Sequence, residues 1–268
     1  MNKNVAGMYA LPDRSSEQVS QAILGQAVEC LEDAPGWRRV RTHDDYSGWI
    51  ESRWLMDARR GSAYAAAGKF VRVANLFAEI LAWPDPGAEV LTKAVIGTDL
   101  ELADQRDDWV LVRLPDGTQG AIRRFAVDVL DRAVHPLPLA PTGWEIAATA
   151  RRFVGVPYLW GGVTPFGLDC SGLAQLVHRL HDVLIPRDAH LQAEDSRFVT
   201  VELDSLQAGD LLFFVSTDDK RPGRKINHVG IALDKDRFIH SSGGAGVAVT
   251  EIAEPGYSSI LTLARRLT

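Results

Sequence analysis

The feature that most constrains the fold is an internal repeat in the first half of the chain. Ten residues between Glu17 and Ile50 recur as the same residue type 72 positions later, between Glu89 and Ile122, without a gap. Two copies of one small domain explain such a repeat. In each copy, short runs of alternating apolar and polar residues are separated by turn-forming Gly, Pro and Asp residues, as in the predicted turn Leu114–Thr118. This pattern predicts small antiparallel barrels.

The repeat also makes a prediction about the first of the two cysteines. Cys30 aligns with Leu102, which is an apolar residue in a predicted strand. We therefore expect Cys30 to be a buried core thiol without reactivity.

Composition limits the class of protein. The chain has 268 residues, of which 46% are hydrophobic, and a formal net charge of −6, which suits two or three small domains. The acidic balance argues against nucleic acid as a partner. Residues 1–20 carry no apolar run of signal-peptide length, and no stretch approaches a membrane span. With only two cysteines, we expect a soluble, cytoplasmic protein with no membrane partner.

The second half centres on Cys170. Leu173, Leu176, Val177 and Leu180 follow it with the spacing of one buried helix face, so Cys170 falls in the first turn of a predicted helix. Free backbone N–H groups and the helix dipole favour thiolate there, and we expect a pKa below the free value of about 8.5. The alternative is a small buried core residue.

Two histidines supply a candidate base for this thiol. Residues 227–233 predict a strand, Asp234–Asp236 a turn, and residues 237–241 a returning strand. In that register His228 lies diagonal to His240 on the same face. A nucleophile needs a base beside it and a third group that orients the base. One strand histidine is more often structural, but two on one face after such a cysteine favour catalysis.

Five motifs occur in a characteristic order over about the last 125 residues: 157–162, 169–172, 208–214, 227–231 and 238–241. In this respect the chain resembles the NlpC/p60 family of papain-like cysteine peptidases. The resemblance implies an α+β papain-like catalytic domain, with Cys170 as nucleophile, His228 as general base and His240 as the orienting third residue. It implies no cofactor.

The repeats resemble bacterial SH3-like domains, which gives the expected organisation. It comprises a first SH3-like domain (1–60), a second (61–132), a proline-rich linker (133–143) and an NlpC/p60 domain (144–268). This arrangement resembles gamma-D-glutamyl-L-diamino-acid endopeptidases. The implied substrate is a murein peptide with a free N-terminal L-Ala, such as L-Ala-gamma-D-Glu-diaminopimelate.

The same resemblance implies a set of substrate-binding residues: Tyr46, Tyr158, Trp160, Asp169, Ser171 and Asp188. Tyr46 and Asp188 would bind the free amine of the substrate. Gln26 and Ala189 depart from the family pattern, where an acidic residue and a serine are usual. Tyr46 and Trp49 occur in the first repeat only, which favours a binding role there over surface packing.

Two other interpretations remain open from the sequence, and a third is not supported. The same thiol and imidazole could transfer an acyl group to an acceptor other than water. A secreted protein could use SH3-like domains to bind intact cell wall. Cys170, His228 and His240 could in principle ligate zinc, but no close ligand pair supports this, and we expect no metal.

Overall fold

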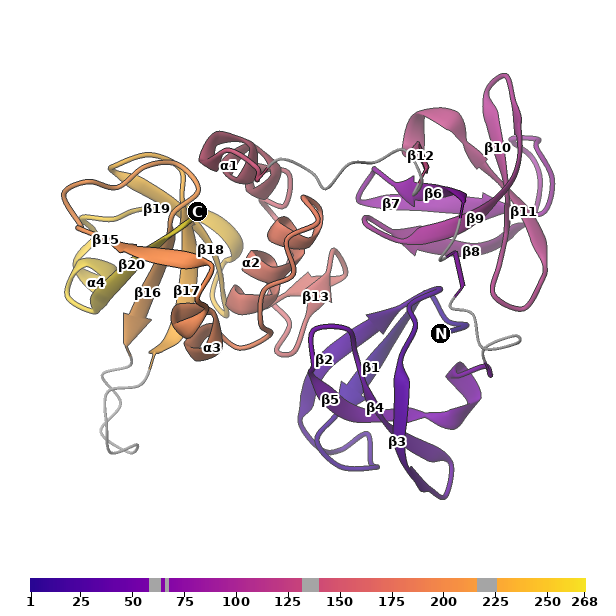
Figure 1. Ribbon diagram of the computed structural model, residues 1–268, viewed down its shortest axis with the longest axis horizontal. Helices are drawn as coiled ribbons and strands as arrows, with labels where there is room; N and C mark the ends of the chain where they lie inside the picture. Colours follow the sequence, from indigo (N-terminus) through magenta and orange to yellow (C-terminus); the bar gives the residue numbers. More distant parts are fainter. Residues whose placement is uncertain (58–63, 66–67, 132–139, 216–225) are drawn as a thin grey trace. The chain divides into compact units, whose positions relative to one another are not determined.

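The computed structural model describes residues 1–57, 64–65, 68–131, 140–215 and 226–268 (Figure 1). Two compact units comprise Met1–Leu137 and Pro138–Thr268. Most of the predicted proline-rich linker lies outside the described residues. So do residues 218–225, whose charged and turn-forming residues predict an exposed loop. The predicted domain boundaries therefore stay predictions.

The first unit contains a five-stranded antiparallel sheet with the strand order β2-β1-β5-β4-β3. Its core is formed by apolar side chains that include the fully buried Met8, Val40 and Ile50. A short 3-10 helix, η1 (Ser52–Trp54), follows the last strand. The strands are β1 (Val5–Tyr9), β2 (Gln18–Ile23), β3 (Glu29–Ala34), β4 (Trp37–Arg41) and β5 (Ser47–Glu51).

The same unit contains a seven-stranded sheet with the order β12-β6-β9-β10-β11-β7-β8. The 3-10 helix η3 (Arg124–Ala126) precedes its last strand. Strand pairing among the described residues closes neither sheet on itself, so the small closed barrels stay a prediction. The strands are β6 (Lys69–Val73), β7 (Phe77–Leu81), β8 (Val90–Val95), β9 (Asp99–Arg106), β10 (Trp109–Arg113), β11 (Gln119–Arg123) and β12 (Val127–Asp131).

The expectation of a buried core thiol at Cys30 is wrong. Cys30 is exposed on β3, which is the edge strand of the five-stranded sheet. Its repeat equivalent Leu102 lies on β9, between β6 and β10, and packs against a core cluster. Equivalent sequence positions thus differ in burial because their strands occupy different places in the sheets.

The second unit has a mixed α+β architecture. Its six-stranded antiparallel sheet has the order β15-β20-β16-β17-β18-β19, and α1, α2 and α3 all contact β17 (Figure 1). The strands are β13 (Val163–Thr164) and β14 (Gly167–Leu168), which form a separate pair, and β15 (Phe198–Val201), β16 (Leu211–Val215), β17 (Ile226–Ala232), β18 (Arg237–Ser242), β19 (Gly246–Glu251) and β20 (Leu261–Leu267). The helices are α1 (Gly143–Arg151), α2 (Cys170–Arg179), α3 (Ala189–Glu194) and α4 (Pro255–Ser258).

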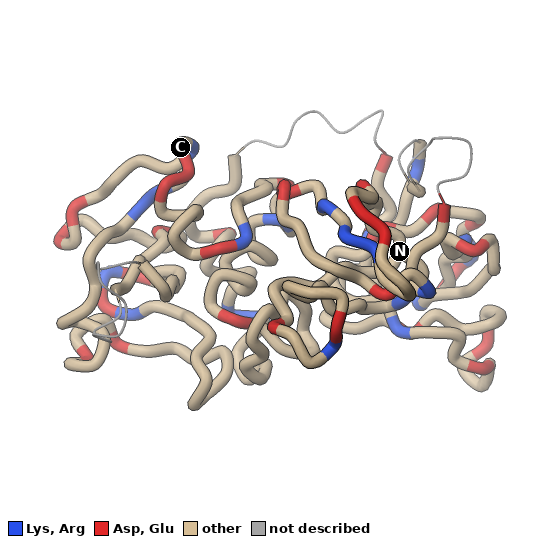
Figure 2. The backbone as a smooth tube through the Cα atoms, turned by 90° about the horizontal axis from the view of Figure 1, so that it is seen from below, with Lys and Arg blue, Asp and Glu red and all other residues tan. Residues whose placement is uncertain are grey.

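Charged residues of both signs are interspersed along the described backbone (Figure 2). Many basic side chains pair with a nearby acid, such as Arg41 with Glu29 and Arg266 with Asp210. Such pairing leaves less positive charge available to contact a phosphate backbone. Among the described residues, no helix is both long enough and apolar enough to cross a membrane.

Candidate active site

The predicted helix begins at Cys170, as the sequence indicated. Asp169 is its N-cap residue, and the Asp169 carboxylate accepts a hydrogen bond from the Gly172 N–H at 2.7 Å. Gly172 permits a close approach, because a Cβ atom there would lie 2.0 Å from the Gly162 carbonyl oxygen. The first turn of α2 is thereby held against the Gly161–Gly162 loop, and Cys170 stands at a fixed helix start.

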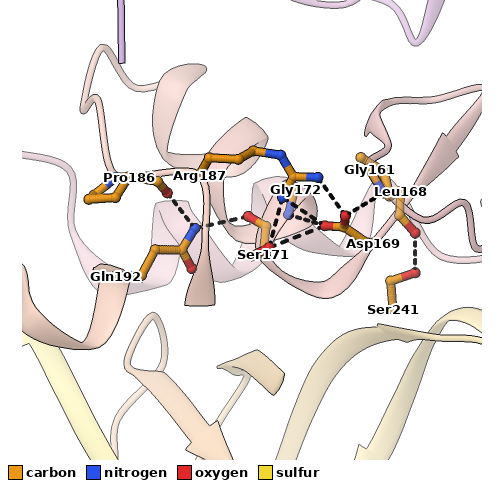
Figure 3. Close-up of polar contacts among 9 residues, drawn as sticks. All are labelled: Gly161, Leu168, Asp169, Ser171, Gly172, Pro186, Arg187, Gln192 and Ser241. Carbon is orange, nitrogen blue, oxygen red and sulfur yellow. Dashed lines mark hydrogen bonds and ion pairs between the residues drawn. The ribbon is translucent and has the colours of Figure 1, made fainter. Parts of the chain in front are cut away.

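A buried ion pair supports this turn (Figure 3). Arg187 Nη1 donates to Asp169 Oδ1 at 3.1 Å and to Ser171 Oγ at 2.8 Å, and Nη2 bonds to the other carboxylate oxygen. The Gly161 N–H donates to Asp169 Oδ2 at 2.9 Å. Arg187 is 2% exposed and Asp169 7%. Both carboxylate oxygens of Asp169, the residue before Cys170, are therefore held by hydrogen bonds.

Two neutral side chains connect this turn to other elements. Gln192 Nε2, on α3, donates to the Ser171 carbonyl at 3.0 Å and to the Pro186 carbonyl at 2.8 Å. Ser241 Oγ, on β18, donates to the Leu168 carbonyl at 2.6 Å. Because Ser241 directly follows His240, this bond joins the histidine-bearing strand to the segment that leads into Cys170.

The two predicted histidines meet as the sequence indicated. Strands β17 and β18 pair with Ile231 opposite Ile239, which is the register that the predicted turn requires. His228 Nε2 lies 2.9 Å from His240 Nδ1, at hydrogen-bond distance. The other ring nitrogen of His240, Nε2, lies 3.1 Å from Thr250 Oγ1 on β19. His228 therefore keeps Nδ1 as the ring nitrogen not engaged by His240.

Aromatic rings surround this imidazole pair. The Phe238 ring centroid lies 4.8 Å from that of His240, and the Phe214 centroid 5.5 Å from that of His228. Tyr257, on α4, contacts His240 edge-on at 4.8 Å and lies 6.3 Å from His228. The surroundings have a low dielectric constant, which disfavours a charged imidazole.

Burial accordingly lowers the pKa of both histidines. The pKa of His228 falls to about 4 because of burial alone. The pKa of His240 falls to about 3 because of burial and the adjacent His228. Both imidazoles are neutral at pH 7, and a neutral imidazole is able to accept a proton.

The predicted lowering of the thiol pKa is wrong. Burial, followed by the nearby Asp169 carboxylate, raises the pKa of the Cys170 thiol to about 11. The backbone N–H groups of Val229 and Ser171 and the charge of Arg187 lower it by less. Cys170 keeps some exposed surface, yet the surroundings of its thiol exclude most water. The free site thus pairs a neutral thiol with a neutral imidazole.

The structure brings several predicted substrate-binding residues near Cys170. Burial raises the pKa of Tyr158 to about 12, with smaller contributions from Cys170 and Asp169, so Tyr158 lies close to both. Asp169 and Ser171 are buried in the network around Arg187. Sequence reasoning missed Arg187 as part of the site, since only its place beside Pro186 and Asp188 distinguished it.

The remaining predicted substrate-binding residues are Trp160, Asp188 and Tyr46. Trp160 is 60% exposed, and Asp188 occupies the N-cap position of α3 without a capping hydrogen bond from its side chain. Tyr46 belongs to the first unit, where its carbonyl accepts from the Thr42 N–H at 2.9 Å. Substrate binding by these residues stays a prediction. Within the described residues, no group of three or more His, Cys, Asp or Glu side chains is arranged to hold a metal ion.

Two protein-family models match parts of this chain. Residues 155–266 match the model of the NlpC/P60 family, and residues 8–55 match the model described as the bacterial dipeptidyl-peptidase Sh3 domain. The first match spans the Cys170 turn and both histidine strands. The chain is a hydrolase that acts on peptides.

Relatives over nearly the whole length define the family. The chain is 30% identical over 263 residues to dipeptidyl-peptidase 6 of Lysinibacillus sphaericus, covering 93% of this chain and 90% of that protein. It is 28% identical to a gamma-D-glutamyl-L-lysine dipeptidyl-peptidase of Bacillus cereus, covering 92% of this chain and 74% of that protein. The chain belongs to the NlpC/P60 family.

A solved structure agrees with the fold. The crystal structure of an NlpC/P60 family protein from Bacillus cereus aligns with a TM-score of 0.87 and 24% sequence identity. The alignment covers 100% of this chain and 98% of that chain. At this level of identity the similarity establishes the fold alone.

Proposed function

We propose that the chain hydrolyses the gamma-D-glutamyl-L-diamino-acid bond of murein peptides that carry a free N-terminal L-Ala. The observation that carries this proposal is the imidazole pair, with His228 Nε2 2.9 Å from His240 Nδ1. The Val229 N–H, in the residue after His228, hydrogen-bonds to the Cys170 thiol at the start of α2. The relative in Bacillus cereus is named gamma-D-glutamyl-L-lysine dipeptidyl-peptidase, which supports this class of bond.

In the proposed mechanism Cys170 is the nucleophile and His228 the general base. The thiol proton passes to His228 Nδ1, and the sulfur attacks the gamma-glutamyl carbonyl carbon. The imidazolium then protonates the leaving amine as the C–N bond breaks, which leaves an acyl-enzyme on Cys170. Water, deprotonated by His228, hydrolyses the thioester and releases the dipeptide.

The neutral resting state gives this mechanism a definite order. A thiol of pKa about 11 does not transfer its proton to an imidazole of pKa about 4 in the free site. Proton transfer therefore accompanies attack on the bound carbonyl, when negative charge moves from sulfur to oxygen. The backbone N–H groups at the start of α2, including that of Cys170, are suited to receive this oxyanion.

In this proposal, Tyr46 and Asp188 bind the free amine of the substrate. A hydroxyl and a carboxylate are suitable partners for an ammonium group. We propose that the first sheet belongs to an SH3-like barrel and the second sheet to a repeated copy, which the repeat between Glu17 and Ile122 supports. A preference for short peptides with a free amine is the property expected of an enzyme that recycles murein peptides.

The test is incubation with L-Ala-gamma-D-Glu-diaminopimelate, the corresponding lysine peptide and their N-acetylated forms, followed by mass spectrometry. We expect release of L-Ala-D-Glu from the free peptides and at least about tenfold slower cleavage of the acetylated ones. Equal cleavage of both forms would contradict the amine assignment. No cleavage of either peptide would contradict the substrate class, and a product joined to an added amine would indicate acyl transfer instead of hydrolysis.

A further inference from the structure

The imidazole pair continues into a third group that neither the sequence patterns nor the family match distinguish. Thr250 lies on β19 directly opposite Phe238, and its Oγ1 is 3.1 Å from His240 Nε2. His240 Nδ1 is in turn 2.9 Å from His228 Nε2. The three side chains form one hydrogen-bonded series that ends at the threonine hydroxyl.

Counting protons along this series leaves one arrangement that permits catalysis. A neutral imidazole carries a single N–H. If His228 Nδ1 is to accept the thiol proton, the His228 proton must reside on Nε2 and be donated to His240 Nδ1. His240 then carries its own proton on Nε2, and this N–H needs an acceptor. Thr250 Oγ1 is at the distance and position to be that acceptor.

The opposite arrangement is inactive. There Thr250 donates its hydroxyl proton to His240 Nε2, His240 donates from Nδ1, and His228 carries its proton on Nδ1. A His228 protonated on Nδ1 has no lone pair for the thiol proton. The difference between the two arrangements is which tautomer each imidazole adopts, and that choice is fixed by the hydrogen bond that the other ring nitrogen makes.

From this geometry we propose that Thr250 is a positioning residue that acts through His240: by accepting the His240 Nε2–H, its hydroxyl supports the tautomer in which His228 Nδ1 is free to accept a proton. The proposal rests on the proposed roles of Cys170 and His228. The surroundings leave few substitutes for the hydroxyl. His240 is 1% exposed, and Phe238 and Tyr257 each contact its ring at 4.8 Å, so water has little access and the ring has little freedom to turn.

Three substitutions separate tautomer selection from packing. Thr250→Val keeps the shape but removes the acceptor, so His240 is expected to move its proton from Nε2, where it would be a buried donor without a partner. Thr250→Ser keeps the hydroxyl. Thr250→Ala removes both the hydroxyl and the γ-methyl group, and a water molecule can partly replace the hydroxyl in the space that they leave. We expect activity in the order Thr, Ser, Ala, Val, whereas a packing role would place Val above Ser and Ala.

The decisive measurement is the 15N spectrum of histidine-labelled protein at pH 7.5, with kinetics on the peptide substrate. In the wild type and in Thr250→Ser, we expect His228 and His240 both protonated on Nε2. In Thr250→Val we expect Nδ1 protonation, and kcat lower by about tenfold or more with KM within about threefold. Identical tautomers in the wild type and Thr250→Val, or an unchanged kcat in Thr250→Val, would overturn the proposal.

This design separates the failure of the inference from that of the proposed function. If the wild type does not cleave gamma-D-glutamyl peptides, the proposed substrate is wrong, while the tautomers still decide the role of Thr250. If the wild type cleaves them and the tautomers of Thr250→Val match the wild type, the role of Thr250 is wrong and the proposed function stands.

Discussion

The two sides of the candidate active site differ in polarity: one is charged and the other is apolar. On the thiol side, Cys170 follows a buried ion pair in which Asp169 accepts hydrogen bonds from Arg187 and from backbone N–H groups. On the imidazole side, His228 and His240 lie among aromatic rings, with one hydroxyl at the end of the series. A charged network holds the proposed nucleophile, and apolar rings surround the proposed base.

This difference follows from what each side has to do. The start of α2 presents several backbone N–H groups, and its turn must be held still for them to face one point, which directional hydrogen bonds to a buried carboxylate achieve. The imidazoles must stay neutral to accept a proton, which burial among Phe214, Phe238 and Tyr257 achieves. Fixed charge on one side and low dielectric on the other therefore support a single reaction.

The largest expected effect comes from breaking the charged side. Arg187→Ala leaves the Asp169 carboxylate buried without its cation, so we expect the second unit to lose about 3–5 kcal/mol of stability. We also expect activity to fall, because the turn that carries Cys170 loses its support. Denaturant unfolding and peptide hydrolysis measure the two effects.

The chain offers a matched control away from the site. Arg266 makes a two-pronged ion pair with Asp210, whose side chain is fully buried, at 2.7 and 2.8 Å. Arg266→Ala should destabilise the unit as well, yet the hydrolysis rate of the folded fraction should stay near that of the wild type. If the folded fractions of Arg266→Ala and Arg187→Ala lost equal activity, a specific role of the Arg187 pair at the site would be contradicted.

A smaller effect concerns the protonation of the thiol. With a Cys170 pKa of about 11, the thiolate fraction rises about tenfold per pH unit near neutral pH, because neutral pH lies far below the pKa. Iodoacetamide alkylation of a Cys30→Ala variant, in which Cys170 is the remaining cysteine, should follow this rise from pH 6 to 9. A plateau before pH 8 would instead indicate a thiolate stabilised by imidazolium in the free site.

The parts of the site that could be predicted from the sequence are those fixed by local periodicity. The apolar stripe from Leu173 to Val177 specified a helix starting at Cys170, and α2 begins there. The turn around Asp234–Asp236 specified a strand register, and the register placed His228 beside His240. In both cases a few neighbouring residues determine the outcome, since helix and strand periods are short.

The parts that could not be predicted depend on the assembled fold. Arg187 reaches Asp169 across 18 residues of sequence, and no pattern marks that contact. Cys30 is exposed because β3 is an edge strand, which depends on the strand order of the sheet. The thiol pKa of Cys170 rises because of burial, a tertiary property that outweighed the local helix start.

The measurement that tests the central claim most directly compares the two cysteines. Cys170→Ala and Cys30→Ala each remove one thiol, the first from the start of helix α2 and the second from an exposed edge strand. We predict that Cys170→Ala lowers kcat for L-Ala-gamma-D-Glu-diaminopimelate by about a thousandfold or more, and that Cys30→Ala stays within about twofold of the wild type. Hydrolysis by Cys170→Ala at more than about a tenth of the wild-type rate would contradict the assignment of Cys170 as the nucleophile.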